Sequence, residues 1–377
     1  MMYKRRRRKV IPTKNLSPAL ILVFLFVIVL VGGFAIYYYF NYIYKAPSNR
    51  VSQDLSIHFL ELGNQYTGDC SLIKVGNTEV LIDAGSKSSS VSTIKSYLDQ
   101  YVTDGTLEYV IATHAHEDHI AGFGTAKNVD SLLDLYQVGT LIQFVHTNSN
   151  SVVYQNYCRE VEEAKSRGTM VYNALQCINA TDGAQKIYEL DKGVKLEILD
   201  QKYYHETTSN ENNNSVCCQI IQNNERYYLF TGDLESGGES SLVDLNQDSL
   251  HQVELYKAGH HGSNTSSSSK LLSKIRPKHV CVCCCAGSSQ YTDNTENQFP
   301  TQEFINRVAP YTDQVYVTTL CTNFDAGIFE SMNGNIVLYC KDEKTTVNCS
   351  NNNLILKNTA WFKSNRTMPS VWLASSI

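Results

Sequence analysis

The stretch HAHEDH, residues 114–119, places three imidazoles and two carboxylates within six positions. It directly follows an apolar run over residues 107–112 that predicts a β-strand, and a loop at the end of a strand can aim several side chains into one cavity. Imidazole and carboxylate suit zinc and similar divalent ions, and a catalytic site leaves one coordination position open for water. The whole chain has ten histidines, so a chance cluster on a solvated loop is a poor alternative. The sequence therefore predicts a metal site here.

Two later segments also place polar residues directly after a strand. Asp233 follows a predicted strand over residues 226–231, and the pair His260 and His261 follows a predicted strand over residues 253–258. Alone, a Gly-Asp turn is ordinary turn chemistry, and a histidine pair is more often structural than ligating. Together with the first segment they form one pattern, because histidines and aspartates at several strand ends can converge on a single pocket.

The other periodic segments predict a layered α/β fold. Three short strands over residues 56–62, 70–75 and 79–82 are separated by glycine-containing turns and indicate an antiparallel meander, and an amphipathic helix follows over residues 91–101. Strands in a run, followed by strands that alternate with helices, are typical of a layered α/β sandwich. The remaining expected elements are helices over 152–167 and 268–275 and strands over 195–199, 216–222, 279–285, 314–317 and 336–339, with a loop over 113–122.

All twelve cysteines lie after residue 50. Cys281, Cys283, Cys284 and Cys285 belong to a short apolar run that predicts a buried strand, where free cysteine behaves as a small hydrophobe. Cys281 and Cys284 have CxxC spacing, but no second such pair accompanies them, so a structural zinc site is not expected.

An uncharged apolar stretch over residues 19–40 has about the 20 residues that cross a bilayer as a helix. Basic residues precede it and several tyrosines lie at its far end, which predicts a single span with the N-terminus in the cytoplasm and the rest of the chain outside. A cleaved signal peptide and a buried core helix are the alternatives. The expected division of the chain is a basic cytoplasmic segment (1–18), a transmembrane helix (19–40), a linker (41–53), a folded domain (54–342) and a tail of unassigned role (343–377).

The three polar segments resemble those of the metallo-β-lactamase superfamily. A narrower resemblance, to the hydrolase domain of the DNA-uptake competence proteins, rests on residues 68–71, 81–85, 113–122, 230–235 and 257–268. The phosphorylcholine esterases of bacterial surfaces share the same outline. This resemblance covers residues 54 to 342 and implies a four-layer αββα sandwich with a two-metal site.

The resemblance also implies how two metal ions are held. The implied ligands are His114 and His116 for one ion, Asp118 and His119 for the other, Asp233 as a bridge, and either His260 or His261 to complete the second site. Asp83 is expected to orient a ligating imidazole from behind, with a plain turn aspartate as the alternative. The ions would be Zn²⁺, with Mn²⁺ as the alternative, and they can share a hydroxide and stabilise both oxygens of a phosphodiester. Asp118 and Asp233 would be the catalytic carboxylates.

The chain departs from the family pattern in two places. The superfamily usually supplies a third histidine to the first metal, but between the first segment and Asp233 only His146 and His205 occur, and neither has the usual glycine-flanked setting. The competence relatives often have a histidine before the proline that matches Pro300, whereas this chain has Phe299 there. The first metal would then be loosely held, or water, asparagine or an unidentified residue would replace the missing ligand.

The preferred function is hydrolysis of phosphodiesters outside the membrane, in nucleic acid or in cell-surface phosphoesters. One alternative is a small-molecule ester, lactone or β-lactam hydrolase, and another is a surface binding module whose incomplete site no longer turns over. The net charge of −5 hides a basic N-terminal cluster and an acidic remainder, so bulk electrostatic attraction to nucleic acid is not predicted. The many-helix channel of the competence proteins has no counterpart here, which argues against a transporter part. The sequence does not indicate any protein partner.

Overall fold

The computed structural model describes residues 32–33, 54–341 and 344–374. The chain divides into two units, residues 1–50 and 51–377. In the first unit only Gly32 and Gly33 are described, and both are helical, so the rest of the expected membrane span and the basic segment before it lie outside the described residues. Among the residues that are described, no helix has the length and apolar character needed to cross a membrane.

The described part of the second unit contains two mixed sheets of eight strands each. The strands of the first sheet are β1 (Leu55–Phe59), β2 (Ser71–Val75), β3 (Thr78–Ile82), β4 (Thr106–Ala112), β5 (Gln137–Gln143), β6 (Met170–Asn173), β15 (Ile336–Lys341) and β16 (Lys344–Cys349). They are ordered β16-β15-β1-β2-β3-β4-β5-β6. Strands β1 to β3 form the expected antiparallel meander, and β3 to β6 run parallel.

The second sheet repeats this change from antiparallel to parallel pairing. Its strands are β7 (Ile187–Asp191), β8 (Val194–Leu199), β9 (Cys217–Gln222), β10 (Arg226–Phe230), β11 (Leu255–Lys257), β12 (His279–Ala286), β13 (Val315–Asn323) and β14 (Ile328–Ser331). Each strand lies beside the next one in the sequence, from β7 at one edge to β14 at the other. Strands β7 to β10 are antiparallel, β10 to β13 are parallel, and β14 is antiparallel at the edge. The expected strands between residues 195 and 339 are all present.

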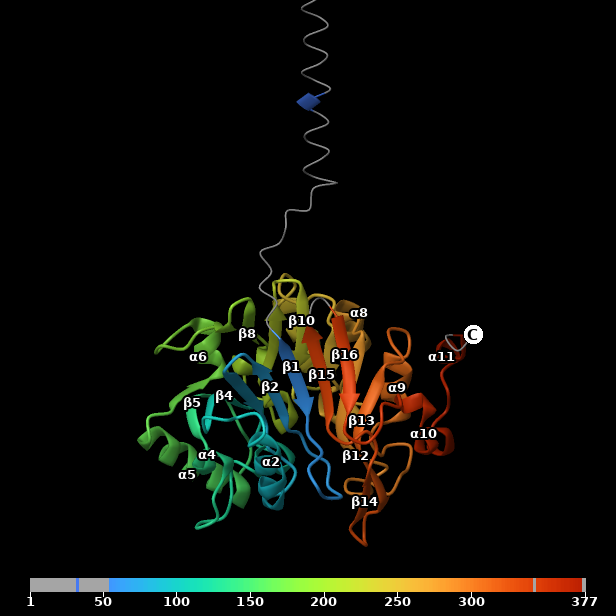
Figure 1. Cartoon of the computed structure of the whole chain (residues 1–377), viewed down its shortest axis with the longest axis horizontal. Helices are drawn as coiled ribbons and strands as arrows, with labels where there is room; N and C mark the ends of the chain where they lie inside the picture. Colours follow the sequence, from blue (N-terminus) through green and yellow to red (C-terminus); the bar gives the residue numbers. More distant parts are fainter. Residues whose placement is uncertain (1–31, 34–53, 342–343, 375–377) are drawn as a thin grey trace, which may run out of the picture. The chain divides into compact units, whose positions relative to one another are not determined.

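Helices flank the strands on both sides. The α-helices of the described domain are α2 (Val91–Leu98), α3 (Glu117–Ile120), α4 (Leu132–Leu135), α5 (Val152–Ser166), α6 (Ala174–Asn179), α7 (Ser236–Leu245), α8 (Ser269–Ile275), α9 (Gln302–Val308), α10 (Ala360–Asn365) and α11 (Ser370–Ala374). In Figure 1, α2, α4 and α5 lie on one side of the strands and α8, α9 and α10 on the other. Two mixed sheets between helices are consistent with the αββα fold. The short helix α3 lies inside the segment that the sequence predicts to be a loop.

The two sheets pack face to face because their strands alternate apolar side chains between two cores. In β10, Tyr228 and Phe230 face the core between the sheets, whereas Leu229 faces the core under the helices. The rings of Phe59 and Phe230 stack across the two sheets with centroids 6.2 Å apart. This period of two is that of a strand buried on both faces.

The cysteine-rich run forms β12 and contributes side chains to both cores. Cys281 and Cys283 belong to the core between the sheets, and Cys284 belongs to the core under the helices. Because Cys281 and Cys284 therefore face opposite sides of the strand, they cannot chelate one ion together. All twelve cysteines are free thiols.

Residues beyond 343, whose role the sequence left open, belong to this same unit. Strand β16 extends the first sheet through its antiparallel pairing with β15. Phe362 in α10 and Trp372 in α11 are buried in the core under the helices, and the Trp372 indole Nε1 donates to the carbonyl of Thr312 at 3.0 Å. The C-terminal segment therefore packs on the second sheet, next to the loops that follow its strands.

Candidate metal centre

The predicted ligands all lie in segments that follow parallel strands. Asp83 follows β3, residues 113–119 follow β4, Asp233 follows β10, and the 260–261 pair follows β11. Strands β3 and β4 are parallel neighbours in the first sheet, and β10 and β11 are parallel neighbours in the second. Since the carboxyl ends of parallel strands meet at one edge of a sheet, both sheets deliver their polar loops to the same place.

Two histidines from different sheets converge on one carboxylate. The Nε2 atoms of His119 and His261 lie 3.1 and 3.3 Å from Oδ2 of Asp233. All three side chains are buried. Oδ2 of Asp118 lies 3.4 Å from the same Nε2 of His261, so a fourth predicted ligand adjoins this group.

The atoms that face one another in this group have the character of metal donors. Among the described residues, Nε2 of His119, Nε2 of His261 and Oδ1 of Asp233 are buried without a hydrogen-bond partner. A buried polar atom without a partner is costly, and a cation beside the two Nε2 atoms would satisfy both of them, whereas Oδ1 of Asp233 lies 3.7 Å from Nζ of Lys257. The residues present thus fit a divalent metal.

The Nδ1 atoms of His119 and His261 are hydrogen bonded to groups on the side away from Asp233. Nδ1 of His119 hydrogen bonds Oδ2 of Asp83 at 2.7 Å, and Nδ1 of His261 donates to the carbonyl of Cys283 at 2.8 Å. Asp83 also accepts from the backbone and the hydroxyl of Thr113. Such bonds fix the tautomer that leaves Nε2 free for a metal.

Charge in the buried group is balanced between imidazoles and carboxylates. Burial lowers the pKa of His119, but Asp233, Asp83 and Asp69 outweigh it and hold that pKa well above its ordinary value. Burial conversely raises the pKa of Asp233, but His119 and His261 hold it well below its usual range. Because ligation requires neutral imidazole, metal binding would displace protons from this group.

Asp69 and Lys257 belong to the buried group, although neither was among the predicted site residues. Oδ1 of Asp69 lies 3.2 Å from Nδ1 of His261, and its other oxygen forms an ion pair with Lys257. The lysine Nζ is also 3.7 Å from Oδ1 of Asp233. Asp69, His119, Asp233 and His261 together form a possible four-ligand set, but Asp69 faces Nδ1 atoms that are already bonded. It therefore suits an orienting role behind the ligands, with Lys257 as its counterion.

The other predicted histidine pair is arranged differently. Nε2 of His114 lies 3.0 Å from Nδ1 of His116, and both residues come from the same loop. Neither candidate for a third histidine joins them: His205 is exposed and pairs with Asp200, and His146 lines a separate cavity of about 190 Å³ beside α5. Asn212 lines the same cavity as His116, and its Oδ1 is buried without a hydrogen-bond partner among the described residues, so it is a candidate to replace the third histidine.

His260 lies at the edge of the centre. Its Nε2 is 3.9 Å from Oδ2 of Asp233, and its Nδ1 hydrogen bonds the hydroxyl of Thr265 at 2.9 Å. His261, by contrast, is buried with its Nε2 directed at Asp233 and Asp118. Of the two histidines, the geometry therefore favours His261 as the ligand.

Two glycines allow the loops to approach this closely. A Cβ on Gly85 would lie 1.6 Å from the carbonyl oxygen of Asp118, so only glycine permits this contact between the two loops. Gly232 has a φ of 52°, and a Cβ there would lie 2.8 Å from the hydroxyl of Ser215. That hydroxyl accepts from the backbone of Asp233 at 3.0 Å, which fixes the turn that carries this carboxylate.

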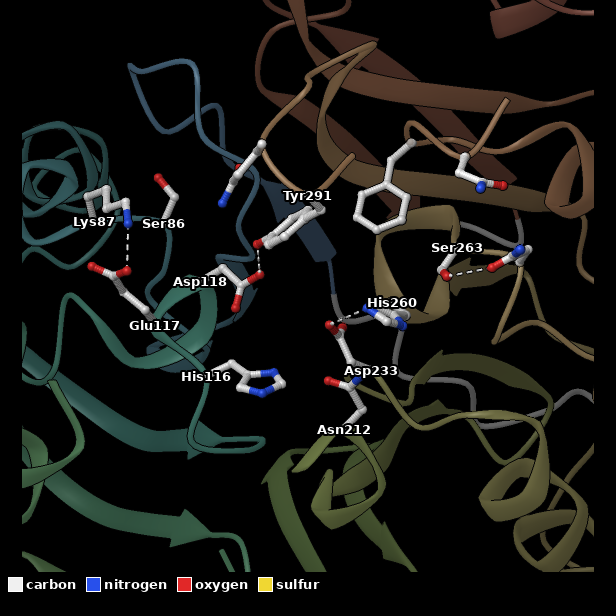
Figure 2. A pocket seen from close by; sticks show the side chains of 14 residues that line it. Ser86, Lys87, His116, Glu117, Asp118, Asn212, Asp233, His260, Ser263 and Tyr291 are labelled. Atoms are coloured by element: carbon white, nitrogen blue, oxygen red, sulfur yellow. Dashed lines mark hydrogen bonds and ion pairs between the residues drawn. The ribbon is translucent and has the colours of Figure 1, made fainter. Parts of the chain in front are cut away.

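A cavity of about 530 Å³ opens onto the centre. His116, Asp118, Asp233 and His260 lie on its floor, and Tyr291 reaches over it from the loop between β12 and α9. Figure 2 shows the Tyr291 hydroxyl directed at Asp118, to whose Oδ2 it donates at 2.5 Å. No sequence pattern singles out Tyr291, which lies in a loop of mostly small and polar residues.

Comparison with known proteins gives a family match over part of the chain. Residues 63–130 match the family model of the metallo-beta-lactamase superfamily. The competence protein ComA of Neisseria gonorrhoeae is 35% identical over 100 residues, which is 26% of this chain and 13% of that protein. The chain thus matches only a small part of its curated relative.

Two solved structures show partial similarity to the chain. The metallo-beta-lactamase fold protein YhfI of Bacillus subtilis has a TM-score of 0.40 and 12% identity, with 74% of this chain and 99% of that chain covered. The long form RNase Z of yeast has a TM-score of 0.37 and 12% identity, with 77% and 42% covered. Scores and identities this low carry no argument about activity.

The matched residues include the whole first histidine segment and Asp69, and the buried cluster unites two of them, Asp69 and His119, with Asp233 and His261. Together they support a metal-dependent hydrolase. In residues 63–130, and in the histidine and aspartate cluster that it folds, the chain is therefore similar to the metallo-β-lactamase superfamily.

Proposed function

We propose that the protein is a metal-dependent phosphodiesterase. The observation that carries this proposal is the convergence of His119, His261 and Asp233, whose buried donor atoms lack hydrogen-bond partners among the described residues and adjoin an open cavity. Donors arranged without partners beside a cavity suit a cation that must also reach a substrate.

The ions that we propose are two Zn²⁺, with Mn²⁺ as the alternative. His119, His261, Asp118 and Asp233 would hold one of them, and His114 and His116, with Asp233 shared, would hold the other. When bound, such ions lower the pKa of a coordinated water and neutralise charge on phosphoryl oxygens.

The protein's own groups complete the proposed chemistry. Asp118 and Asp233 would orient the attacking water, since their carboxylates face the cavity. The Tyr291 hydroxyl, which donates to Asp118, can hold that carboxylate in place. Lys87 lies at the rim of the same cavity, where it is paired with Glu117 at 2.5 Å, and it can attract an anionic substrate.

A binding module without turnover is the second candidate function. One observation favours it: neither His146 nor His205 lines the cavity, so the His114 and His116 pair lacks the family's third histidine. The first ion would then depend on Asn212 or water and could be too weakly held for catalysis.

We also propose that residues 19–40 anchor the protein in a membrane, with the N-terminus in the cytoplasm and the hydrolase domain outside. The uncharged apolar run and the basic cluster before it support this topology. Resistance of the protein to carbonate extraction, together with digestion of the domain by protease added to intact cells, tests it. Release by carbonate or complete protection from protease would contradict it.

The first experiment measures metal content per chain and turnover of bis-p-nitrophenyl phosphate before and after chelation. Close to two metals per chain, with turnover that chelation abolishes and Zn²⁺ or Mn²⁺ restores, is expected. Metal binding without turnover would favour the binding module, and hydrolysis of a cephalosporin but not of the phosphodiester would favour a β-lactam hydrolase.

A further inference from the structure

We propose that the cavity wall formed by Tyr291 and Phe299 binds an uncharged aromatic substituent of a small phosphodiester. This wall, the aromatic wall, belongs to the loop between β12 and α9. The inference rests on the proposed function, because it assigns a subsite for the part of the substrate that is not transferred.

The chemistry of the aromatic wall suits a planar ligand. The rings of Tyr291 and Phe299 lie 5.8 Å apart with planes tilted by 48°, and the Phe299 ring lies 5.7 Å from that of His260. Tyr291 is 55% exposed, so a large part of its surface is free for a ligand. Exposed aromatic faces of this kind bind planar groups by stacking.

Charged and uncharged residues lie on different sides of the cavity, so the phosphate of a substrate and its uncharged substituent would bind on different sides. The residues that the β12 to α9 loop contributes to the cavity are all uncharged: Gln290, Tyr291, Asn297 and Phe299. The paired Lys87 and Glu117 stand across the cavity, as Figure 2 shows. An anionic phosphate therefore fits at the metal centre, and a neutral group fits against the aromatic wall.

The charge of the whole domain disfavours a long polyanion. The first 50 residues contain nine lysines and arginines and no acidic residue, so the net charge of −5 for the chain becomes −14 for residues 51–377. A surface of this sign repels a nucleic acid strand beyond the cavity. A phosphodiester small enough to sit within about 530 Å³ meets less of this repulsion.

The aromatic wall is held in place at the base of its loop. The backbone of Gly287 donates to the carbonyl of Phe299 at 2.9 Å, which closes the loop on itself. The Gln290 side chain accepts from the backbone of Thr67 at 2.8 Å, which ties the loop to the first sheet. A subsite fixed in this way loses little entropy when a ligand binds.

The C-terminal segment clamps the same loop from outside. Arg366 donates to the carbonyls of Gln298 at 2.6 Å and Pro300 at 3.0 Å, and its guanidinium lies 4.7 Å from the centroid of the Trp361 ring. A Cβ on Gly287 would lie 2.7 Å from Nε1 of that tryptophan. Arg366 thus acts as a positioning residue for the aromatic wall, and this gives a function to the segment beyond residue 350.

Two esters with the same leaving group test the subsite on the metal-loaded full chain in detergent. Bis-p-nitrophenyl phosphate carries an aromatic substituent that methyl p-nitrophenyl phosphate lacks. We expect the wild-type KM for the bis-aryl ester to be about tenfold lower, as stacking of one ring predicts. Phe299→Leu should remove most of this difference with metal content unchanged.

Three further variants separate the subsite from general damage. Tyr291→Ala should weaken the preference as Phe299→Leu does and should also lower kcat, because it removes the hydroxyl that donates to Asp118. Arg366→Ala should weaken the preference less, chiefly through KM rather than kcat. Phe324→Leu is the matched control, because Phe324 contacts Tyr66 in a hairpin loop and does not line the cavity. It should keep the wild-type ratio.

The outcomes distinguish the inference from the proposed function. Turnover of both esters with equal KM in the wild type would overturn the aromatic subsite and leave the phosphodiesterase standing. Efficient cleavage of long DNA without preference between the esters would also overturn it. Absence of turnover of either ester by metal-loaded protein would overturn both.

Discussion

The two histidine pairs of the metal centre are built in different ways. His119 and His261 come from different sheets, each has its Nδ1 held by another group, and their Nε2 atoms share Asp233. His114 and His116 come from one loop and contact each other. The fold therefore prepares one of the two proposed metal positions from many directions, whereas the other proposed position depends on a single loop and on whichever group replaces the missing histidine.

Removal of the Asp233 carboxylate should have the largest effect, because it lies beside His119 and His261 and is the proposed bridge between the two metal positions. Asp233→Ala should lower turnover by more than about 100-fold, which is the upper end of the loss expected when a group that only supports a ligand is removed. Elemental analysis should show that bound metal is lost. Asp244→Ala is the control, since that carboxylate is exposed and pairs with Lys270 on the helical surface. Full metal content and activity in Asp233→Ala would show that neither position needs the bridge.

Asp83→Asn tests the better-prepared position alone. The amide keeps the size of the carboxylate but loses the charged acceptor for Nδ1 of His119. Affinity for one metal should fall by about 10-fold to 100-fold, while the other is retained. Competition with a coloured chelator measures this, and Asp99→Asn, at an exposed helix end, is the matched control. Equal weakening of both metals would contradict independent positions.

Graded chelation of the wild type compares the two positions directly. The ion at His114 and His116 should leave first, so metal loss should occur in two steps, each near one equivalent. His116→Ala should remove the weaker step and leave the stronger one. Loss of both metals in one step, in the wild type, would mean that the two positions bind cooperatively.

A histidine outside the centre should affect stability but not turnover. Burial lowers the pKa of His58 to about 4, so the folded state binds fewer protons than the unfolded state as the pH falls from 6.5. The free energy of unfolding should therefore drop by about 3 kcal/mol between pH 6.5 and pH 4 from this residue alone.

Urea unfolding at several pH values, with metal held constant, measures this contribution. His58→Gln should flatten that part of the curve relative to wild type and leave activity at pH 7 unchanged. An identical pH dependence in both proteins would assign the acid sensitivity to the metal centre instead.

The parts of the fold with strong local patterns could be predicted from the sequence. The first meander, the helix that became α5 and the strands that end at Asp233 and His261 all follow apolar periodicity. Strand β5 was missed because Gln137 and Gly139 interrupt its apolar run, and α7 because two glycines occupy its first turn. Such elements form because neighbouring strands and helices pack on them, which local sequence does not reveal.

The missed site residues differ in what could have revealed them. Lys257 ends the apolar strand β11, and a lysine within such a run is a sign of a buried partner. Asp69 precedes β2 in a segment that already resembled the family. Tyr291 and Arg366 carry no local signal, because long-range packing alone brings them to the cavity.

The shared position of Asp233 between His119 and His261 has a mechanical consequence. An ion bound there would act as a removable cross-link between the two sheets, joining loops that are far apart along the chain. Without the ion, the loops of the two sheets would be joined only through longer stretches of the chain. Hydrogen exchange in the loops after β4, β10 and β11 should therefore become faster well before the cores themselves open. The bound metal would thus stabilise the contact between the two sheets of the domain.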